Sequence, residues 1–507
     1  MKEDTTMKKL VSLLLACCML LSLSAAFAGD KVELTAFQYA LENQNTDFNG
    51  LWFFDELEQK TNTHVTFQMV KDADWATNVN LMFAVPDQMP DMILRHAVDV
   101  EEYGVSQGLL LPLDEYLTEE IMPNYVSRLN INNAGDSIPA SDGKTYYIGF
   151  LMAQNVNHTG TWYVNQKELE KLGKTAPATI DEVTELLRAM KADGIKWPFS
   201  ASYTQFGPET IWNQFASFGV PENTYYYFID ENNQVQFTCA QDGWRACVEW
   251  LHQLYEEELM DPESLTQDSN LWANKVNDGE VGYFCYLRLI NTAIKAENVE
   301  NFKSILPPAA DGFKACVSQI LEVPEAGAYL TKNCKDPVAA LKWIDAQLET
   351  ETMMVSLNGK VGEQIVLNDE GKYEVIDIPA DNGLYQFVPV TMGQFFAPGD
   401  YYTSIYQMAP HRVERYEDSK WYAEAGVLEP RSFQYLRDLS KMSNEDATEA
   451  SDIYTELQKL VEESFANFVR NGVTDDSWNS FLSQAKAIGS DRYIELYQTA
   501  YNAYLAK

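Results

Sequence analysis

The stretch KVELTAF, residues 31–37, alternates polar and apolar side chains and therefore predicts a β-strand. A helical pattern follows over residues 51–60, and a second alternating stretch covers residues 65–69. Another helical stretch, residues 75–83, leads to the short apolar run DMIL at 91–94, which is typical of a buried parallel strand. Strands and helices that alternate in this way predict an α/β fold for the first part of the chain.

A leader precedes this α/β region. Two lysines stand before an apolar run over residues 10–23, and the small-x-small pattern AFA closes the run at 26–28. The run is shorter than the about 20 apolar residues that a membrane-spanning helix needs. We therefore predict a cleavable signal peptide over residues 1–28 and an extracytoplasmic protein that is secreted, periplasmic or associated with the cell surface. Cys17 leaves lipidation open, and Met7 is an alternative start.

Composition limits the partners and cofactors of the chain. A formal net charge of −38 would repel nucleic acid. The cysteines beyond the leader are odd in number and have no CxxC or His partners at metal spacing, so we expect buried thiols, no metal and no cofactor. Aromatic residues form 12% of the chain, with 11 Trp and 28 Tyr, which exceeds ordinary core needs. Because aromatic faces cover the apolar faces of sugar rings, this content indicates carbohydrate binding.

One motif for catalysis occurs, in an unsuitable context. GVSQG, residues 104–108, fits the G-x-S-x-G pattern of a serine nucleophile. A nucleophile elbow needs a strand before it and a helix after it, whereas a polar, helix-like stretch precedes this motif and LLLP follows it. Acidic pairs such as Glu119/Glu120 and Asp475/Asp476 could serve a glycosidase only at a suitable spatial separation. We expect no catalytic residue, and a secreted carbohydrate-active enzyme is the alternative function.

Polar residues follow several predicted strands, and open α/β sheets bind ligands beyond the carboxyl ends of their strands. Such residues follow the strand at 31–37, the strand at 91–94 and a further apparent strand at 281–285. Loops without a function would explain each segment singly, so both interpretations remain open. The candidates for polar contacts at these positions are Tyr39, Asn43, Arg95, His96, Tyr286 and Arg288.

Several ungapped stretches match a known pattern, and they do so in the expected order. They are MFAVPDQMPDMI at 82–93, YGVSQGLLLPLDEYL at 103–117, SDGKTYYIGF at 141–150, WYVNQKELEKLGKTAPATIDEV at 162–183 and the closing segment at 478–501. With these stretches the chain resembles the extracellular solute-binding proteins of family 1, in their long, oligosaccharide-binding, lipoprotein-A-like branch. The resemblance covers nearly everything after the leader.

The resemblance implies an α/β, two-lobed periplasmic-binding-protein fold that closes around a ligand cleft by hinge motion. It implies an N-terminal lobe of residues 29–157 plus 318–350, and a C-terminal lobe of residues 158–317 plus 351–507 with a helical end. It further implies a monomer that binds a carbohydrate, most simply an oligosaccharide, and delivers it to the permease subunits of an ABC importer. A binding protein for a non-sugar ligand such as a peptide remains the other alternative.

Two further expectations concern the ligand and calcium. The forked donors of Arg95 suit vicinal hydroxyls or a sugar carboxylate. Relatives in this branch often carry a calcium-binding segment at a position where this chain keeps only Asp193, between Lys191 and Lys196. One carboxylate beside two ammonium groups does not offset the dehydration of a divalent ion, so we expect no calcium there, and residues 230–234 predict a turn. The aromatic candidates for stacking on sugar rings are Trp162, Trp197, Tyr203, Trp212, Trp272 and Tyr286.

Overall fold

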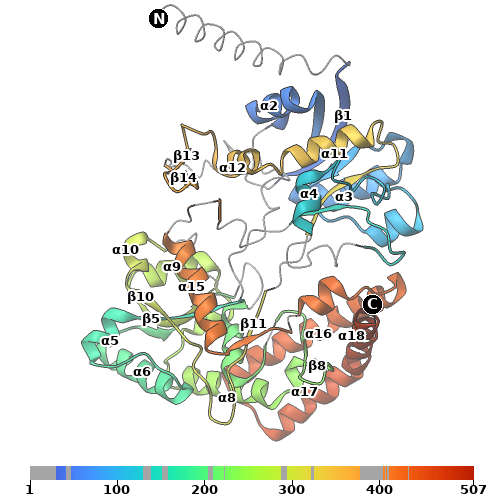
Figure 1. Ribbon diagram of the computed structural model, residues 1–507. Helices are drawn as coiled ribbons and strands as arrows, with labels where there is room; N and C mark the ends of the chain where they lie inside the picture. The colour runs from blue at the N-terminus through green and yellow to red at the C-terminus, as the bar shows by residue number, and fades with distance from the viewer. Residues whose placement is uncertain are drawn as a thin grey trace, which may run out of the picture. The chain divides into compact units, whose positions relative to one another are not determined.

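The computed structural model describes residues 30–40, 47–129, 139–150, 158–203, 209–221, 223–286, 294–320, 325–376, 404–405, 407, 410–431 and 433–506. The signal-peptide prediction therefore lies outside the described residues. The chain divides into two compact units, drawn in Figure 1. Unit 1 contains Met1–Met152 and Pro324–Ala397, and unit 2 contains Ala153–Val323 and Pro398–Lys507.

Unit 1 is built on a five-stranded sheet with the order β2-β1-β3-β12-β4. Its first three strands are parallel, and β12 runs antiparallel to both of its neighbours. Alternation in the sequence correctly predicted β1 and β2, and the short apolar run at 91–94 correctly predicted β3. The strands are β1 (Val32–Ala40), β2 (Thr63–Lys71), β3 (Met92–Leu94), β4 (Ile148–Phe150) and β12 (Glu325–Leu330).

The sheet of unit 1 separates two cores. Leu34 and Ala36 of β1 lie in one core, against α2 (Trp52–Thr61) and α11 (Pro337–Ala346). Phe37 lies in the other core, which α3 (Asp72–Phe83) covers. Successive residues of a strand point to opposite faces, so β1 supplies both cores. The remaining elements near this sheet are η1 (Phe48–Gly50), η2 (Pro86–Gln88), the π-helical turn η3 (Glu101–Ser106) and α4 (Pro123–Leu129).

A helix and a hairpin complete unit 1: α12 (Thr350–Asn358), β13 (Ile365–Leu367) and β14 (Tyr373–Val375). The lobe bounds that the resemblance implies end the first lobe at residue 350, whereas the contacts place these elements with unit 1. Lys60 of α2 forms an ion pair with Glu349 and a 3.0 Å hydrogen bond to the Thr352 hydroxyl. Val355 also packs against the core beneath α2.

Unit 2 contains a four-stranded sheet with the order β10-β5-β9-β6, in which β6 and β9 are parallel. Its strands are β5 (Thr161–Asn165), β6 (Trp197–Phe199), β9 (Val281–Tyr286) and β10 (Phe302–Ile305). Two smaller pairings accompany it, the hairpin of β7 (Tyr227–Ile229) with β8 (Val235–Phe237) and the pairing of β11 (Val317–Ser318) with β15 (Leu428–Glu429). Asp230 closes the predicted turn between β7 and β8 by accepting hydrogen bonds from the backbones of Asn232 and Gln234.

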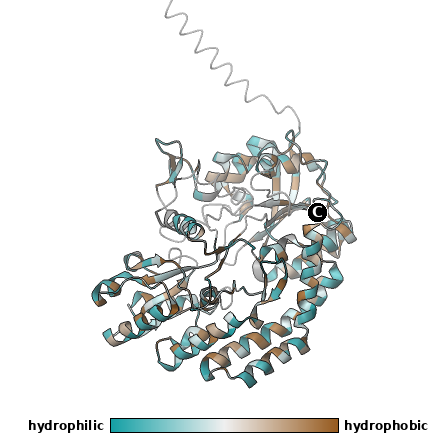
Figure 2. Cartoon of the chain, turned by 60° about the horizontal axis from the view of Figure 1, so that its bottom comes forward, coloured by the Kyte–Doolittle hydropathy of each residue, from teal (hydrophilic) through white to brown (hydrophobic). Residues whose placement is uncertain are grey.

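The helices of unit 2 include the expected helical end of the chain. Thr179 and Glu182 form a capping box at the start of α6. Figure 2 shows helices with both teal and brown sides, as expected for helices that cover a core. The helices are α5 (Gln166–Leu172), α6 (Ile180–Asp193), α7 (Glu209–Trp212), η5 (Asn213–Phe218), η6 (Thr238–Ala240), α8 (Asp242–Glu256), η7 (Pro262–Leu265), α9 (Ser269–Asn277), α10 (Ala296–Val299), α15 (Pro410–Glu424), η9 (Tyr435–Leu439), α16 (Asn444–Asn471), α17 (Asp475–Ile488) and α18 (Ser490–Leu505).

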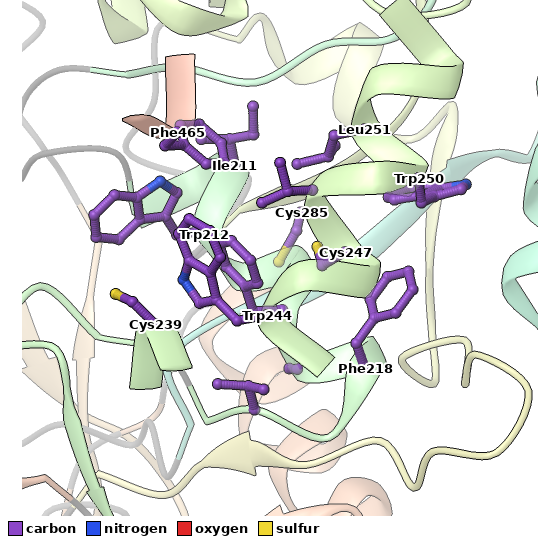
Figure 3. Packing of buried hydrophobic residues seen from close by; sticks show 14 of the residues in the cluster. Ile211, Trp212, Phe218, Cys239, Trp244, Cys247, Trp250, Leu251, Cys285 and Phe465 are labelled. Carbon is purple, nitrogen blue, oxygen red and sulfur yellow. The ribbon is translucent and has the colours of Figure 1, made fainter. Parts of the chain in front are cut away.

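Aromatic side chains build much of the unit 2 core. Trp244 of α8 stacks on Phe215, with ring centroids 5.1 Å apart, and on Phe481 of α17 at 5.8 Å. Figure 3 shows Trp212, Trp244 and Phe465 gathered from α7, α8 and α16. Eight of the 11 tryptophans of the chain are buried. The aromatic content is therefore explained largely by packing, which corrects the inference that it exceeds the needs of the core.

Cys239, Cys247 and Cys285 are buried in the unit 2 core, as expected. Burial raises the pKa of both Cys316 and Cys334 to about 12. Across the described ranges, no helix combines the length and the apolar character needed to span a membrane.

Candidate ligand-binding site

Three neighbouring parallel strands of unit 1 end at the same edge of the sheet. Tyr39 lies at the carboxyl end of β1, between β2 and β3. Arg95 and His96 directly follow β3, and Trp75 lies in the first turn of α3, which directly follows β2. The carboxyl edge of an open α/β sheet is where such folds bind ligands. The structure therefore brings Tyr39, Arg95 and His96 to one edge, as the sequence predicted.

Three of these side chains form a ring cluster, which consists of Tyr39, Trp75 and His96. The Tyr39 and His96 rings lie 4.7 Å apart, with planes inclined by 45°. Trp75 contacts Tyr39 at 5.5 Å with nearly perpendicular planes, and it contacts His96 at 5.2 Å. Trp75 is buried, whereas Tyr39 and His96 are only partly buried. Trp75 is not among the residues predicted from the sequence, although its position just after β2 was a usable signal.

Arg95 has an unusual backbone conformation for a residue with a side chain. Its φ is 81°, in the left-handed region, which costs a non-glycine residue about 1–2 kcal/mol. The Arg95 N–H donates a 2.6 Å hydrogen bond to the carbonyl of Gly327. Gly327 stands at an irregularity of β12, where the pairing shifts between Ala326 and Ala328. Strain and bulges of this kind gather at functional sites, which supports a role for Arg95 in binding.

The loop after β3 is anchored to the same core that contains Trp75. The Val98 N–H donates a 3.0 Å hydrogen bond to the Tyr329 hydroxyl, and both residues are buried. Burial raises the pKa of Tyr329 well above its usual range, so the hydroxyl stays neutral and keeps its proton. Arg95 and His96 are thus held between strand β3 and this anchor.

In unit 2 the carboxyl end of β9 carries an aromatic pair. Tyr286 is the last residue of β9 and is partly buried, while Trp272 of α9 is fully buried. The two rings stack with centroids 4.6 Å apart and planes inclined by 7°. Tyr286 therefore lies where the sequence predicted a site residue. The enclosed Trp272 instead supports it and presents no open face of its own.

Two other tryptophan candidates are core residues. Trp162 of β5 is 0% exposed, and its indole N–H donates a 3.3 Å hydrogen bond to Gln214. Trp212 is 2% exposed and packs against Phe465 and Tyr226. Side chains enclosed in this way do not favour the stacking role predicted for them, because neither ring face is open to a sugar.

The last two aromatic candidates lie at different ends of β6. Trp197 begins β6 and pairs with Val281, the first residue of β9, so it lies at the edge of the sheet opposite Tyr286. Its partly exposed ring lies 5.8 Å from the ammonium of Lys196. Tyr203 follows the carboxyl end of β6, where burial raises its pKa to about 12. Of these two aromatic residues, only Tyr203 lies at the carboxyl end of the strands, where the site is predicted. The remaining candidates, Asn43 and Arg288, lie outside the described residues.

A buried ion pair supports the loop region beyond β6. Lys275 contacts Asp261 at 2.6 Å, and the exposed fractions of the two side chains are 10% and 0%. The hydroxyl of Ser200, which directly follows β6, donates a 2.9 Å hydrogen bond to the same carboxylate. Gln267 also donates to it, and the Gln267 carbonyl accepts the backbone N–H of Tyr203. No spacing pattern in the sequence revealed this network.

Catalytic and metal chemistry find little support in the geometry. Ser106 of the G-x-S-x-G pattern lies in the helical turn η3 and donates a 2.9 Å hydrogen bond to the Glu101 carbonyl. Lys171 forms ion pairs with both Asp193 and Glu168, so the Asp193 carboxylate already has a cation. Within the residues that the structure describes, no cluster of three or more His, Cys, Asp or Glu could hold a metal ion. The arrangement at the strand ends is suited to binding.

Comparison with known proteins identifies the family of the chain. The model of the bacterial extracellular solute-binding proteins matches residues 28–354, and the chain belongs to this family. It is similar to the fructooligosaccharide ABC transporter substrate-binding protein FusA of Streptococcus pneumoniae. The two are 23% identical over 496 residues, which cover 91% of this chain and 88% of FusA.

Solved structures share the fold. The structure of S. pneumoniae FusA in complex with kestose is 20% identical and has a TM-score of 0.76. An HMO-binding, ABC-transporter-associated solute-binding protein from Bifidobacterium longum infantis is 16% identical and has a TM-score of 0.81. Each alignment covers 94% of this chain and 99% of the other. The predicted α/β solute-binding-protein fold is confirmed.

Proposed function

We propose that the protein is the extracytoplasmic solute-binding component of an ABC importer and that it binds a carbohydrate, most simply an oligosaccharide. The observation that carries the proposal is the pair of half-buried rings of Tyr39 and His96, which project beside Arg95 at the carboxyl edge of a sheet in a solute-binding protein. Aromatic faces cover the apolar C–H face of a sugar, and guanidinium donors match its hydroxyls. The similarity to FusA along most of the chain supports the same class of ligand.

The proposed ligand residues are those that the structure leaves partly accessible at strand ends. In unit 1 these are Tyr39, Arg95 and His96, and in unit 2 they are Tyr203 and Tyr286. When an aromatic side chain that stacks on a nucleic-acid base is replaced by alanine, about 1–3 kcal/mol of binding free energy is lost. We expect a loss of the same size for an aromatic side chain that stacks on a sugar ring. Hinge closure, a monomeric state and export through a signal peptide remain predictions, and the partners we propose are permease subunits in the membrane.

Calorimetric titration of the purified chain tests the proposal. The panel contains kestose, nystose, an alginate oligosaccharide, an N-glycan oligosaccharide and a set of short peptides. We expect saturable binding of at least one carbohydrate and no shortening of it during long incubation. Tyr39→Ala should then weaken that binding about 5- to 150-fold, which corresponds to the range above. Phe228 is a partly buried aromatic residue of the β7–β8 hairpin, so Phe228→Ala is the matched control and should bind normally.

The two alternatives predict different outcomes of the same experiment. Steady release of shorter products would show that the protein is a carbohydrate-active enzyme and not a binding protein. Binding of peptides without binding of any sugar would instead identify a transporter component for a non-sugar ligand.

A further inference from the structure

Trp75 connects the core of unit 1 with the ring cluster at the strand ends. Its side chain is 5% exposed and belongs to the core that α3 covers. The indole contacts Phe37 at a centroid distance of 5.4 Å and contacts both partly buried rings, Tyr39 and His96, at 5.5 and 5.2 Å. It therefore reaches from fully buried packing to the two rings that the proposed function assigns to the ligand.

The strand geometry explains why one residue can contact both rings. Phe37 and Tyr39 are two residues apart on β1, so they point to the same face of the sheet. Helix α3 packs on that face, and its first turn stands beside the carboxyl end of β1. His96 arrives from the next strand, β3, and is within 4.7 Å of Tyr39. The indole thus fills the space behind two rings that come from different strands.

The orientation of the rings shows what this packing does. The planes of Trp75 and Tyr39 are inclined by 81°, so the indole holds Tyr39 by an edge contact and does not stack along it. The planes of Trp75 and His96 are inclined by 39°. A ring that packing has already fixed loses less conformational freedom when a ligand binds, and this improves affinity without a new contact.

From these observations we infer that Trp75 is a positioning residue for carbohydrate binding, which fixes the orientation of Tyr39 and His96 without touching the sugar. The inference rests on the proposed function. It assigns to a buried residue an effect on affinity that core packing alone does not predict.

The experiment compares Trp75→Leu with Trp343→Leu. Trp343 is 2% exposed and lies in the other core of unit 1, where it packs against Phe54 at 6.0 Å. Both variants remove a buried indole from the same unit, so both should lower the melting temperature. Only Trp75→Leu should weaken binding of the sugars in the panel, by about 3- to 10-fold, because one or two aromatic contacts are lost. Trp75→Phe keeps a ring and should restore most of the affinity.

A second measurement needs no sugar. The imidazole signals of His96, assigned by their loss in His96→Asn, are read by NMR in each variant. Because the Trp75 indole lies 5.2 Å from the His96 ring, its removal should shift these signals, whereas Trp343→Leu should leave them unchanged.

In a Tyr39→Ala background, Trp75→Leu should cause a smaller further loss of affinity than it causes alone.

The outcomes separate this inference from the proposed function. Equal losses of affinity in Trp75→Leu and Trp343→Leu would assign the effect to general destabilisation and overturn the inference. Unchanged affinity in a folded Trp75→Leu protein would overturn it as well. If the unmodified protein bound no sugar, the proposed function would fail, and an unmoved His96 signal in Trp75→Leu would independently refute the positioning role.

Discussion

The backbone of Arg95 allows a test that separates an effect on stability from an effect on binding. At φ 81° a residue with a Cβ is strained by about 1–2 kcal/mol, and glycine is not. Glycine also gains freedom in the unfolded chain, which costs about 0.5–1 kcal/mol of stability. Both Arg95→Gly and Arg95→Ala remove the guanidinium, so the comparison between them isolates the backbone. We expect Arg95→Gly to be about 0.5–1 kcal/mol more stable than Arg95→Ala.

Thermal and urea unfolding of the two variants measure this difference. For a unit of about 150–250 residues, 1 kcal/mol corresponds to about 2–4 °C in melting temperature. Both variants should bind the sugars of the panel more weakly than the unmodified protein, since both lack the forked donor. An Arg95→Ala protein that is as stable as Arg95→Gly would refute the strain argument, and normal binding by both would remove Arg95 from the site.

Three further expectations concern buried charge, pH and calcium. Lys275→Met removes the cation beside the buried Asp261 carboxylate, so the free energy of unfolding measured in urea should fall by about 3–5 kcal/mol. A decrease below about 1 kcal/mol would contradict this expectation. The hydrogen bonds of Arg188 lower the pKa of Glu257 from 4.5 to about 2, so this pair contributes stability that is present above pH 4.5 and lost as the pH falls toward 2. Glu257→Gln should therefore have a slightly lower melting temperature than the unmodified protein at pH 7 and the same melting temperature near pH 2. The difference should stay within about 1 kcal/mol of unfolding free energy, because the pair is exposed. A difference that does not change with pH would contradict the pairing of Glu257 with Arg188. Because Asp193 already pairs with a lysine, melting curves in excess calcium and in chelator should coincide, and a drop of several degrees in chelator would reveal an overlooked site.

Local pattern predicted the parts of the fold that local chemistry determines. Alternation identified β1 because successive side chains of a strand point to opposite faces. The sequence TIDE at 179–182 has the capping-box pattern that marks a helix start, because the Thr179 hydroxyl and the Glu182 carboxylate satisfy N–H groups that a helix leaves open. The common position of Tyr39 and His96 could be predicted because parallel strands of an α/β sheet end at one edge.

Other features depend on contacts that no local pattern records. Trp162 and Trp272 were named as stacking residues because cores and sugar sites use the same side chains, and only packing distinguishes them. Trp197 was named without knowledge of the direction of β6, which places it at the edge opposite Tyr286. The position of Trp75 just after β2 was a usable signal, but the rings that it contacts depend on the side of the sheet that α3 covers.

Each unit supports a strand-end tyrosine with a buried tryptophan, by an edge contact in unit 1 and by stacking in unit 2. In unit 1, Tyr39 at the end of β1 rests against buried Trp75 from α3, and in unit 2, Tyr286 at the end of β9 stacks on buried Trp272 from α9. In each unit the tyrosine is partly buried and the tryptophan belongs to a core. A substitution of either tyrosine should therefore affect binding more than stability, because little core packing is removed. A substitution of either tryptophan should affect both, since the ring that orients the tyrosine also fills the core.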